Sequence, residues 1–306
     1  MSKYTKIADK IVETYEDNLV FLRPKFQWHY LVRKWRIDND HLYIQPILAS
    51  YQLLSLRGFD YVVNIANRKY VEEEGKRKLS KWSGKTERMV ARRELYMGDP
   101  QQLYYFQVIK YMFYLKTFYL HEHPKVKPFF DVALQELKKI DFAKWLFSPE
   151  MLKDNPSGVS NYTFYLQFLR THDYEDRLID AIRDYWANKK DFKGLLFENK
   201  IYGHTHLILA ASYYYQRTLD GEKFEWVLKF FEENFERILQ ERNADLIAEV
   251  GLVFRLCGKG DHEIVKKCQD YLIEVFDEDR GLIPKEGAKS TLERLEHRNI
   301  LAIMLL

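Results

Sequence analysis

The fold of this chain can be read from residues 224–256, FEWVLKFFEENFERILQERNADLIAEVGLVFRL. In the first half of this stretch, apolar residues recur at intervals of three and four, at Phe224, Val227, Phe231, Phe235 and Ile238. Charged residues fill the positions between them, so the spacing predicts an amphipathic helix with one buried stripe. The second half, 246–256, is apolar nearly all round, which is typical of a helix without a solvated face. The stretch therefore predicts a hairpin of one outer and one inner helix.

The same alternation runs through the rest of the chain. Outer helices are predicted to begin near Lys3, His41, Lys125, Tyr174, Glu222 and Asp261, and inner helices near Phe26, Gln101, Ser160, Tyr202, Asn243 and Thr291. About six hairpins of this kind predict an all-α protein, with an inner barrel and an outer jacket of helices. An open solenoid is the alternative, but it would expose the apolar segment 301–306 at its end, which favours closure into a ring. We expect a single α/α-toroid domain over residues 1–306.

Residues 60–97 interrupt this period. Lys and Arg residues are frequent in the segment, but Glu residues are interleaved with them. We interpret 60–97 as a charged helical excursion within the domain. A surface for nucleic acid or a protein partner is the alternative, and the interleaved acidic residues make nucleic acid the weaker partner.

The composition is that of a globular protein, with 46% hydrophobic and 30% charged residues and a formal net charge of +3. Such a small net charge does not favour binding to nucleic acid or to an anionic membrane, and no uncharged apolar run is long enough to span a membrane. The chain has 2 cysteines, too few for a disulfide framework, so we expect a reduced, cytoplasmic protein. Its 22 Tyr, 20 Phe and 6 Trp residues fill a large core or, in part, line a cavity for a sugar or other flat ligand.

A short motif, here called the repeated phrase, occurs twice between a predicted outer helix and the inner helix that follows it. Gly194-Leu195-Leu196 precedes Tyr202-Gly203-His204-Thr205-His206, and Gly281-Leu282-Ile283 precedes Glu296-His297-Arg298-Asn299. We interpret both phrases as loops that return the chain to an inner helix. Polar residues near the starts of inner helices should then surround one mouth of the barrel. The candidates for this mouth are Trp28, His29, Asp99, Tyr104, Tyr105, Asn161, Tyr162, Tyr202, His204, His206, Asn243, Asp245, Glu249, Glu296, His297 and Arg298.

The first group that could carry chemistry is the histidine pair at 204 and 206. On a helix, residues two apart point about 200° away from each other, so His204 and His206 cannot hold one metal together unless their segment is still a loop. Tyr202 and His206 are four apart and share a face. At least one of the two histidines is then a packing or capping residue.

The second group is a pair of carboxylates, Asp245 and Glu249, which share one face of an otherwise apolar helix. This arrangement is costly unless the two are solvated, paired or used in function. If they lie close together, one pKa rises and a general acid/base pair results. The structural alternative is that both pair with arginines, for which the sequence offers Arg242, Arg255 and Arg298.

The third group is Glu296, His297 and Arg298. Glu293 shares a helix face with His297, a common way to orient an imidazole. Arg298 could bind a carboxylate or phosphate through two N–H groups. The structural alternative is a polar helix start that is buried by ring closure, with Arg298 capping the carbonyls of a neighbouring helix.

The alternating hairpins, with Asp279-Arg280-Gly281-Leu282-Ile283-Pro284 leading into Glu296-His297-Arg298-Asn299, resemble the α/α-toroid proteins. That group includes six-hairpin glycosidases and polysaccharide lyases, terpenoid cyclases, protein prenyltransferases and lanthionine-synthetase cyclases. The chain is most similar to an uncharacterised bacterial and archaeal toroid family of unknown function. The resemblance implies a fold and does not by itself imply an activity.

Several chemistries lack their motifs in this chain. DDxxD and DxDD are absent, which argues against terpenoid cyclisation, and no zinc-ligand spacing, GxGxxG, GxxxxGKS or GxSxG occurs. We therefore expect no metal and no cofactor.

The leading hypothesis is an enzyme of the glycoside hydrolase or lyase type, acting by acid/base chemistry on a saccharide-like or other polar small substrate. Glu296 or Asp245 would be the acid or base, His204 or His297 its partner, and Arg298 the anion clamp. Stacking or hydrogen bonds would come from Tyr104, Tyr162 and Tyr202. The alternative is a non-enzymatic module that binds a small molecule, a peptide or a protein partner.

Overall fold

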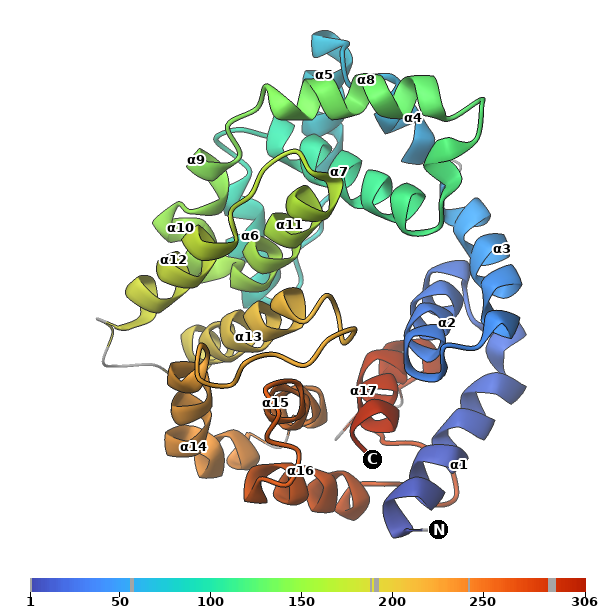
Figure 1. Cartoon of the computed structure of the whole chain (residues 1–306), viewed down its shortest axis with the longest axis vertical. Helices are drawn as coiled ribbons and strands as arrows, with labels where there is room; N and C mark the ends of the chain where they lie inside the picture. Colours follow the sequence, from blue (N-terminus) through green and yellow to red (C-terminus); the bar gives the residue numbers. More distant parts are fainter. Residues whose placement is uncertain (1, 56–57, 188, 190–192, 242, 286–289) are drawn as a thin grey trace. The chain divides into compact units, whose positions relative to one another are not determined.

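The computed structural model of the chain is helical throughout the residues that it describes, 2–55, 58–187, 189, 193–241, 243–285 and 290–306 (Figure 1). The all-α prediction is confirmed there, since the β-type pairing in these ranges is limited to an isolated bridge between Asp277 and Leu282. Among the helices in these ranges, none is long and apolar enough to cross a membrane. The chain divides into two compact units, unit 1 with Met1–Leu54 and Ser212–Leu306, and unit 2 with Ser55–Ala211.

Unit 1 combines the two ends of the chain. Its helices are α1 (Lys3–Asp17), η1 (Leu19–Phe21), α2 (Pro24–Asp38), η2 (His41–Tyr43), α3 (Ile44–Ser55, whose last residue falls in unit 2), α14 (Glu225–Gln240), α15 (Ala244–Leu256), α16 (Glu263–Glu274) and α17 (Leu292–Leu305). Helix α15 packs against α14, α16 and α17, while α17 also packs against α1 and α2. The last helix of the chain therefore lies between elements from its beginning and elements from its end.

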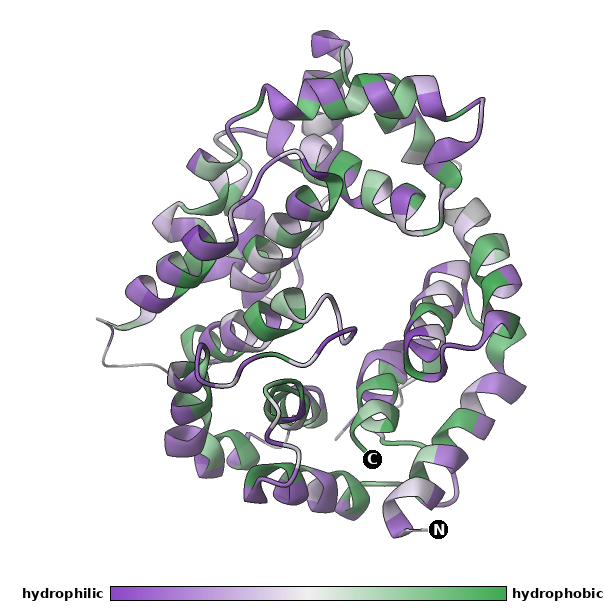
Figure 2. Cartoon of the chain, viewed as in Figure 1, coloured by the Kyte–Doolittle hydropathy of each residue, from purple (hydrophilic) through white to green (hydrophobic). Residues whose placement is uncertain are grey.

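Burial separates the helices of unit 1 into two kinds. Helix α15 buries residues on every face, whereas α1 buries only Ala8, Ile11 and Tyr15. Figure 2 shows the same contrast, with α15 almost wholly hydrophobic and α14 and α16 striped by hydrophilic residues. The decisive stretch 224–256 thus forms α14 and α15, an amphipathic helix followed by a fully buried one.

Unit 2 is one continuous segment of chain. Its helices are α4 (Gly58–Val63), α5 (Arg68–Ser80), α6 (Glu87–Leu95), α7 (Gln101–Thr117), η3 (Leu120–Glu122), α8 (Lys127–Lys138), α9 (Ala143–Leu146), α10 (Pro149–Asp154), α11 (Pro156–Leu169), α12 (Glu175–Ala187) and α13 (Gly194–Ala211). Helices α7, α11 and α13 bury residues all round. Helix α11 packs against both α7 and α13, and α8 and α12 are amphipathic.

The segment 60–97 is helical, as predicted, and forms most of α4 together with α5 and α6. Asn67 and Thr86 begin α5 and α6, because their side-chain oxygens accept hydrogen bonds from backbone N–H groups of the first turn. Several of its charges are paired within the segment itself, including Lys76 with Glu72 and Arg77 with Glu74. These pairs neutralise part of the basic charge that the sequence suggested for a partner.

The two copies of the repeated phrase differ in structure. Gly281 has φ +62 in a loop before α17, as predicted. The prediction of a loop at Gly194-Leu195-Leu196 is wrong, because α13 begins at Gly194. Phe197 and Ile201 continue the buried face of this helix, and their burial favours helix over loop. As a result, His204 and His206 lie inside a helix and not at its start.

Candidate functional site

Unit 1 brings seven charged and histidine side chains together from three helices. We call them the polar cluster: His29 and Arg33 on α2, Asp245 and Glu249 on α15, and Glu296, His297 and Arg298 on α17. On α2 and α15 the two members are four residues apart and therefore share a face. All but Arg33 were candidates from the sequence. Its position four residues after His29 on an inner helix is the signal that could have identified it.

His29 lies between a carboxylate and a guanidinium. Its Nδ1 is 2.6 Å and 2.8 Å from the two carboxylate oxygens of Glu296, and its Nε2 contacts Nη1 of Arg33. A guanidinium can only donate, so Nε2 accepts from Arg33 and Nδ1 carries the proton donated to Glu296. Burial and the charge of Arg33 hold the pKa of His29 well below its ordinary value. This imidazole is therefore neutral, and it joins a cation to an anion.

Glu296 is the anion of this arrangement. Only 1% of the residue is exposed, and burial alone would raise its pKa. The hydrogen bond and electrostatic interaction with His29, together with the charge of Arg33, outweigh burial and hold the pKa of Glu296 below its usual value. Glu296 is thus an ionised carboxylate whose oxygens are already engaged.

His297 belongs to a second imidazole–carboxylate pair beside the first. Its Nδ1 is 3.1 Å from Oδ1 of Asp245, and its ring centroid is 5.7 Å from that of His29. Burial opposes protonation of His297, but the hydrogen bond to Asp245 and the nearby charges of Asp245 and Glu249 raise its pKa above the ordinary value. The two neighbouring histidines therefore have pKa values shifted in opposite directions.

Arg298 completes the second pair from the opposite side. Its Nη2 donates to Oδ2 of Asp245 at 3.2 Å, and its Nη1 donates to the carbonyl of Pro284 at 2.8 Å. Burial would raise the pKa of Asp245, but His297 and Arg298 together lower it, so Asp245 is ionised. Two donor nitrogens of Arg298 are thus used inside the protein. The remaining arginine alternatives differ: Arg255 donates to the carbonyl of Met304, and Arg242 lies outside the described residues.

Glu293, the partner predicted for His297 on its own helix, binds Arg23 instead. The Glu293 carboxylate accepts hydrogen bonds from the backbone N–H and the side chain of Arg23, and its nearest Arg23 nitrogen is 2.7 Å away in the ion pair. The prediction that Glu293 orients His297 is therefore wrong, and Asp245 does so from α15. Spacing along one helix cannot reveal a partner that another helix supplies.

Exposure distinguishes the members of the polar cluster. Glu249 and Glu296 are each 1% exposed. The side chain of Asp245 is 21% exposed and that of His297 is 42% exposed. Nε2 of His297 has no hydrogen-bond partner among the described residues. His297 is therefore the member that a substrate reaches most readily. In the described part of the chain, no group of three His, Cys, Asp or Glu side chains has an arrangement that could hold a metal ion.

The remaining candidate histidines lie in unit 2. His204 is 2% exposed, and its Nδ1 donates to the carbonyl of Lys200 at 2.7 Å. Burial lowers the pKa of His204 to about 3, so the ring is a neutral packing residue. Nδ1 of His206 is 3.3 Å from the side-chain oxygen of Asn161, and its ring lies 6.3 Å from that of Tyr202. The shared face of Tyr202 and His206 is thus observed.

The aromatic candidates are packed in different ways. Tyr104 is fully buried, and its hydroxyl donates to the carbonyl of Tyr61. Trp28, in unit 1, is 8% exposed and lies beside Tyr51. Tyr162 stacks on Phe106 with a centroid distance of 4.1 Å, and it lines a cavity. Tyr162 is therefore the one of these three that faces open space.

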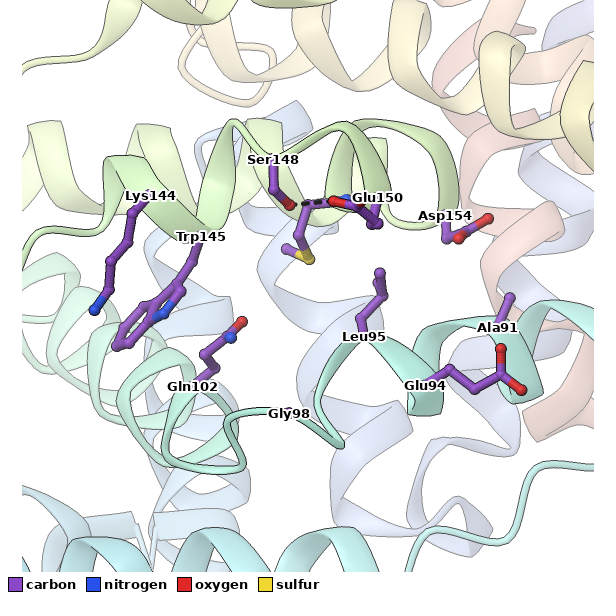
Figure 3. A pocket seen from close by; sticks show the side chains of 11 residues that line it. Ala91, Glu94, Leu95, Gly98, Gln102, Lys144, Trp145, Ser148, Glu150 and Asp154 are labelled. Carbon is purple, nitrogen blue, oxygen red and sulfur yellow. Dashed lines mark hydrogen bonds between the residues drawn. The ribbon is translucent and has the colours of Figure 1, made fainter.

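Two cavities of unit 2 lie side by side along α6 and differ in charge. The acidic pocket, of about 430 Å³, is lined by Glu94, Glu150, Asp154, Lys144, Trp145 and Gln102, among others (Figure 3). The aromatic pocket, of about 340 Å³, is lined by Arg92, Lys110, Trp82, Tyr96, Asn161 and Tyr162, among others. Asp154 lines the acidic pocket, and its backbone carbonyl accepts a hydrogen bond from Arg92 of the aromatic pocket. Only the second pocket includes residues proposed from the sequence.

Comparison with known proteins places the chain in a family without an assigned activity. A domain of unknown function, DUF3541, matches residues 4–306, so the chain belongs to that family. Neither the curated proteins nor the solved structures include a match to this chain. The likeness to α/α toroids therefore rests on the sequence pattern alone.

Proposed function

We propose that this member of the family is an acid/base catalyst whose reacting group is the imidazole of His297, and that it acts on a small polar substrate such as a saccharide. One observation carries the proposal: two imidazole–carboxylate pairs lie side by side with opposite pKa shifts. Groups whose environments push their pKa values apart are typical of acid/base sites.

The members of the cluster take distinct roles. His297, with its raised pKa and partly exposed side chain, donates a proton to the substrate and takes it back in a later step. Asp245 is a positioning residue, because it fixes Nδ1 of His297 and stabilises the charged ring. Arg298 holds Asp245 in place from the other side. The proposal gives His204 no role in the reaction, because its ring is neutral and buried.

Glu249 supplies negative charge near the reacting group, whereas Glu296 is paired with His29. Both carboxylates are buried, so a mechanism with two solvent-accessible carboxylates receives little support from their exposure. The neutral His29 and the guanidinium of Arg33 screen Glu296 from His297. In this proposal Glu296 therefore tunes the pKa of its neighbours and does not itself transfer a proton.

The test is a screen of nitrophenyl glycosides for hydrolysis and of uronic-acid polymers for elimination, with the wild-type chain and three variants. His297→Gln and Asp245→Asn should each lower the rate by about a hundredfold, the usual contribution of one acid/base group. His41→Gln, a change at an exposed histidine of the same unit, should leave the rate unchanged. The Asp245→Asn variant should also move the alkaline limb of the pH–rate profile to lower pH, because the pKa of the proton donor His297 falls without the carboxylate. A rate that survives His297→Gln would refute the role of His297.

A ligand-binding module is the second candidate, and the two cavities of unit 2 favour it. If no substrate in the screen is turned over but sugars or sugar acids raise the melting temperature, binding without catalysis is the better description.

We also propose that the helical hairpins belong to one α/α toroid spanning residues 1–306, with 60–97 as an excursion. The support is the alternation of fully buried and amphipathic helices within each unit. A crystal structure of the full chain tests this proposal, because a toroid requires six hairpins in a closed ring, with the inner helices forming a barrel and the outer helices surrounding it.

A further inference from the structure

The aromatic pocket of unit 2 has flat, apolar walls. It lies among residues of α6, α7 and α11 and the segment before α6, and its volume is about 340 Å³. Tyr162 and Phe106 form one wall as a parallel stack, with 9° between their planes. Trp82 and Tyr96 form another, with ring centroids 5.8 Å apart. Walls and volume of this kind suit a ligand of one or two rings.

The charge in this pocket is positive. Arg92 and Lys110 line it, and its lining includes no Asp or Glu. The hydrogen bonds of Arg92 go to neutral acceptors, with Nε donating to the carbonyl of Asp154 and Nη2 to the hydroxyl of Ser157, each at 3.2 Å. Burial and the neighbouring charge of Arg88 lower the pKa of Arg92. A cation in such a place gains most from a ligand that brings its own negative charge.

Arg88, four residues before Arg92 on α6, has a carboxylate partner of its own. Its guanidinium is committed to Glu198 at 2.5 Å and lies over the ring of Tyr202. Asp154, whose backbone carbonyl accepts from Arg92, lines the acidic pocket, and Lys153 lies 3.7 Å from its carboxylate. Burial raises the pKa of Asp154, which weakens it further as a counter-ion. The guanidinium therefore lacks a full carboxylate partner on its own side of α6.

Two further donors line the aromatic pocket. The hydroxyl of Tyr162 makes no hydrogen bond among the described residues, and Nε1 of Trp82 is buried without a partner. Buried N–H groups are nearly always paired in native proteins, so an acceptor supplied by a ligand would satisfy Nε1 of Trp82. The hydroxyl of Tyr162 is a second donor that such a ligand could reach. The positive charge, the hydrogen-bond donors and the aromatic walls of the pocket all suit the same kind of ligand, a flat ring with a negative charge.

We propose that the pocket lined by Arg92, Trp82 and Tyr162 binds a small planar aromatic anion, a ring that carries a carboxylate or a phosphate. The anionic group pairs with Arg92, and the ring lies against the stacked Tyr162 and Phe106. This site belongs to unit 2 and does not depend on the acid/base chemistry proposed for His297.

Calorimetric titration of the full chain with four probes tests the proposal. 4-Hydroxybenzoate and phenyl phosphate carry both the ring and the charge, 4-hydroxybenzamide lacks the charge, and acetate lacks the ring. At least one of the two aromatic anions should bind, at least about tenfold more tightly than the amide, and acetate should not bind. The relative affinity of the carboxylate and the phosphate identifies the anionic group. Equal binding of the amide, or no binding of either anion, overturns the proposal.

Variants locate the binding in this pocket. Arg92→Met should weaken the anion at least about tenfold, whereas Arg93→Met, at the next residue of α6 and outside the pocket, should not. Because Arg92 also connects α6 to α10 and α11, Tyr162→Phe is the second variant. It keeps the stack on Phe106 and removes only the free hydroxyl, so affinity should fall severalfold while the melting temperature stays constant. Unchanged affinity in both folded variants places the ligand elsewhere and overturns the assignment.

Discussion

His204 makes the folded chain sensitive to acid in a way that can be calculated. The pKa of its imidazole is about 6.5 in the unfolded chain, and burial lowers this pKa to about 3 in the folded chain. Between these values the unfolded chain binds more protons, so stability is complete above the unfolded pKa and is lost as the pH falls. At about pH 5, well above the folded pKa, the loss from this one group is roughly 2 kcal/mol of the free energy of unfolding.

The matching variant is His204→Gln, which keeps a donor for the carbonyl of Lys200 but cannot be protonated. Urea unfolding followed by circular dichroism, at a series of pH values from neutral to about 5, measures the free energy for both proteins. The variant should lose about 2 kcal/mol less than the wild type over this range. His41→Gln, at an exposed histidine, is the control and should follow the wild type. Parallel pH dependences for wild type and His204→Gln would show that the ring is accessible to protons in the folded state, contrary to its burial.

Three further outcomes follow from particular contacts. The pKa of His297, measured by the NMR shifts of its ring protons, should lie above 6.5 in the wild type and fall in Asp245→Asn; no change would mean that Asp245 does not stabilise the protonated ring. Asn299→Leu should lower the free energy of unfolding in urea by about 2–4 kcal/mol, because its buried amide pairs with the backbone N–H and C=O of the loop before α17; a loss below that range would contradict these bonds. Gly251→Ala should lower the melting temperature, because the added Cβ would lie 2.6 Å from a side chain of α17. Gly98→Ala, with open space around it, is the control. Equal effects of the two changes would refute the close packing at Gly251.

The helical architecture could be predicted from the sequence because it depends on local periodicity. The spacing of Phe224, Phe231 and Phe235 predicts a helix with one buried face. All three side chains are buried, Phe231 and Phe235 within α14 and Phe224 at its N-cap. Some of the turn chemistry is local as well. The side chain of Asp220 accepts a hydrogen bond from the N–H of Glu222 in the turn before α14. His262 begins α16, because its Nδ1 accepts from the N–H of Ile264.

Part of the polar cluster could be expected from the sequence, but its pairing could not. Polar residues on otherwise apolar helices identified His29, Asp245 and Glu296, because such groups are buried only with partners. Which carboxylate orients which imidazole depends on how α2, α15 and α17 pack, and no spacing within one helix contains that information. For the same reason His204 and His297 looked alike in sequence, yet one is a neutral packing residue and the other carries a raised pKa.

The order of the two units along the chain has a consequence for biosynthesis. Unit 2 is continuous, so all of its residues are present in the growing chain once residue 211 has been added. Unit 1 is not: α1 and α2 are made first but pack against α17, the last helix, and the hydroxyl of Tyr15 reaches the carbonyl of Leu292. Helices α1 and α2 must therefore wait, with their apolar faces uncovered, while more than 200 residues are added. The polar cluster therefore cannot assemble until α17 has been made.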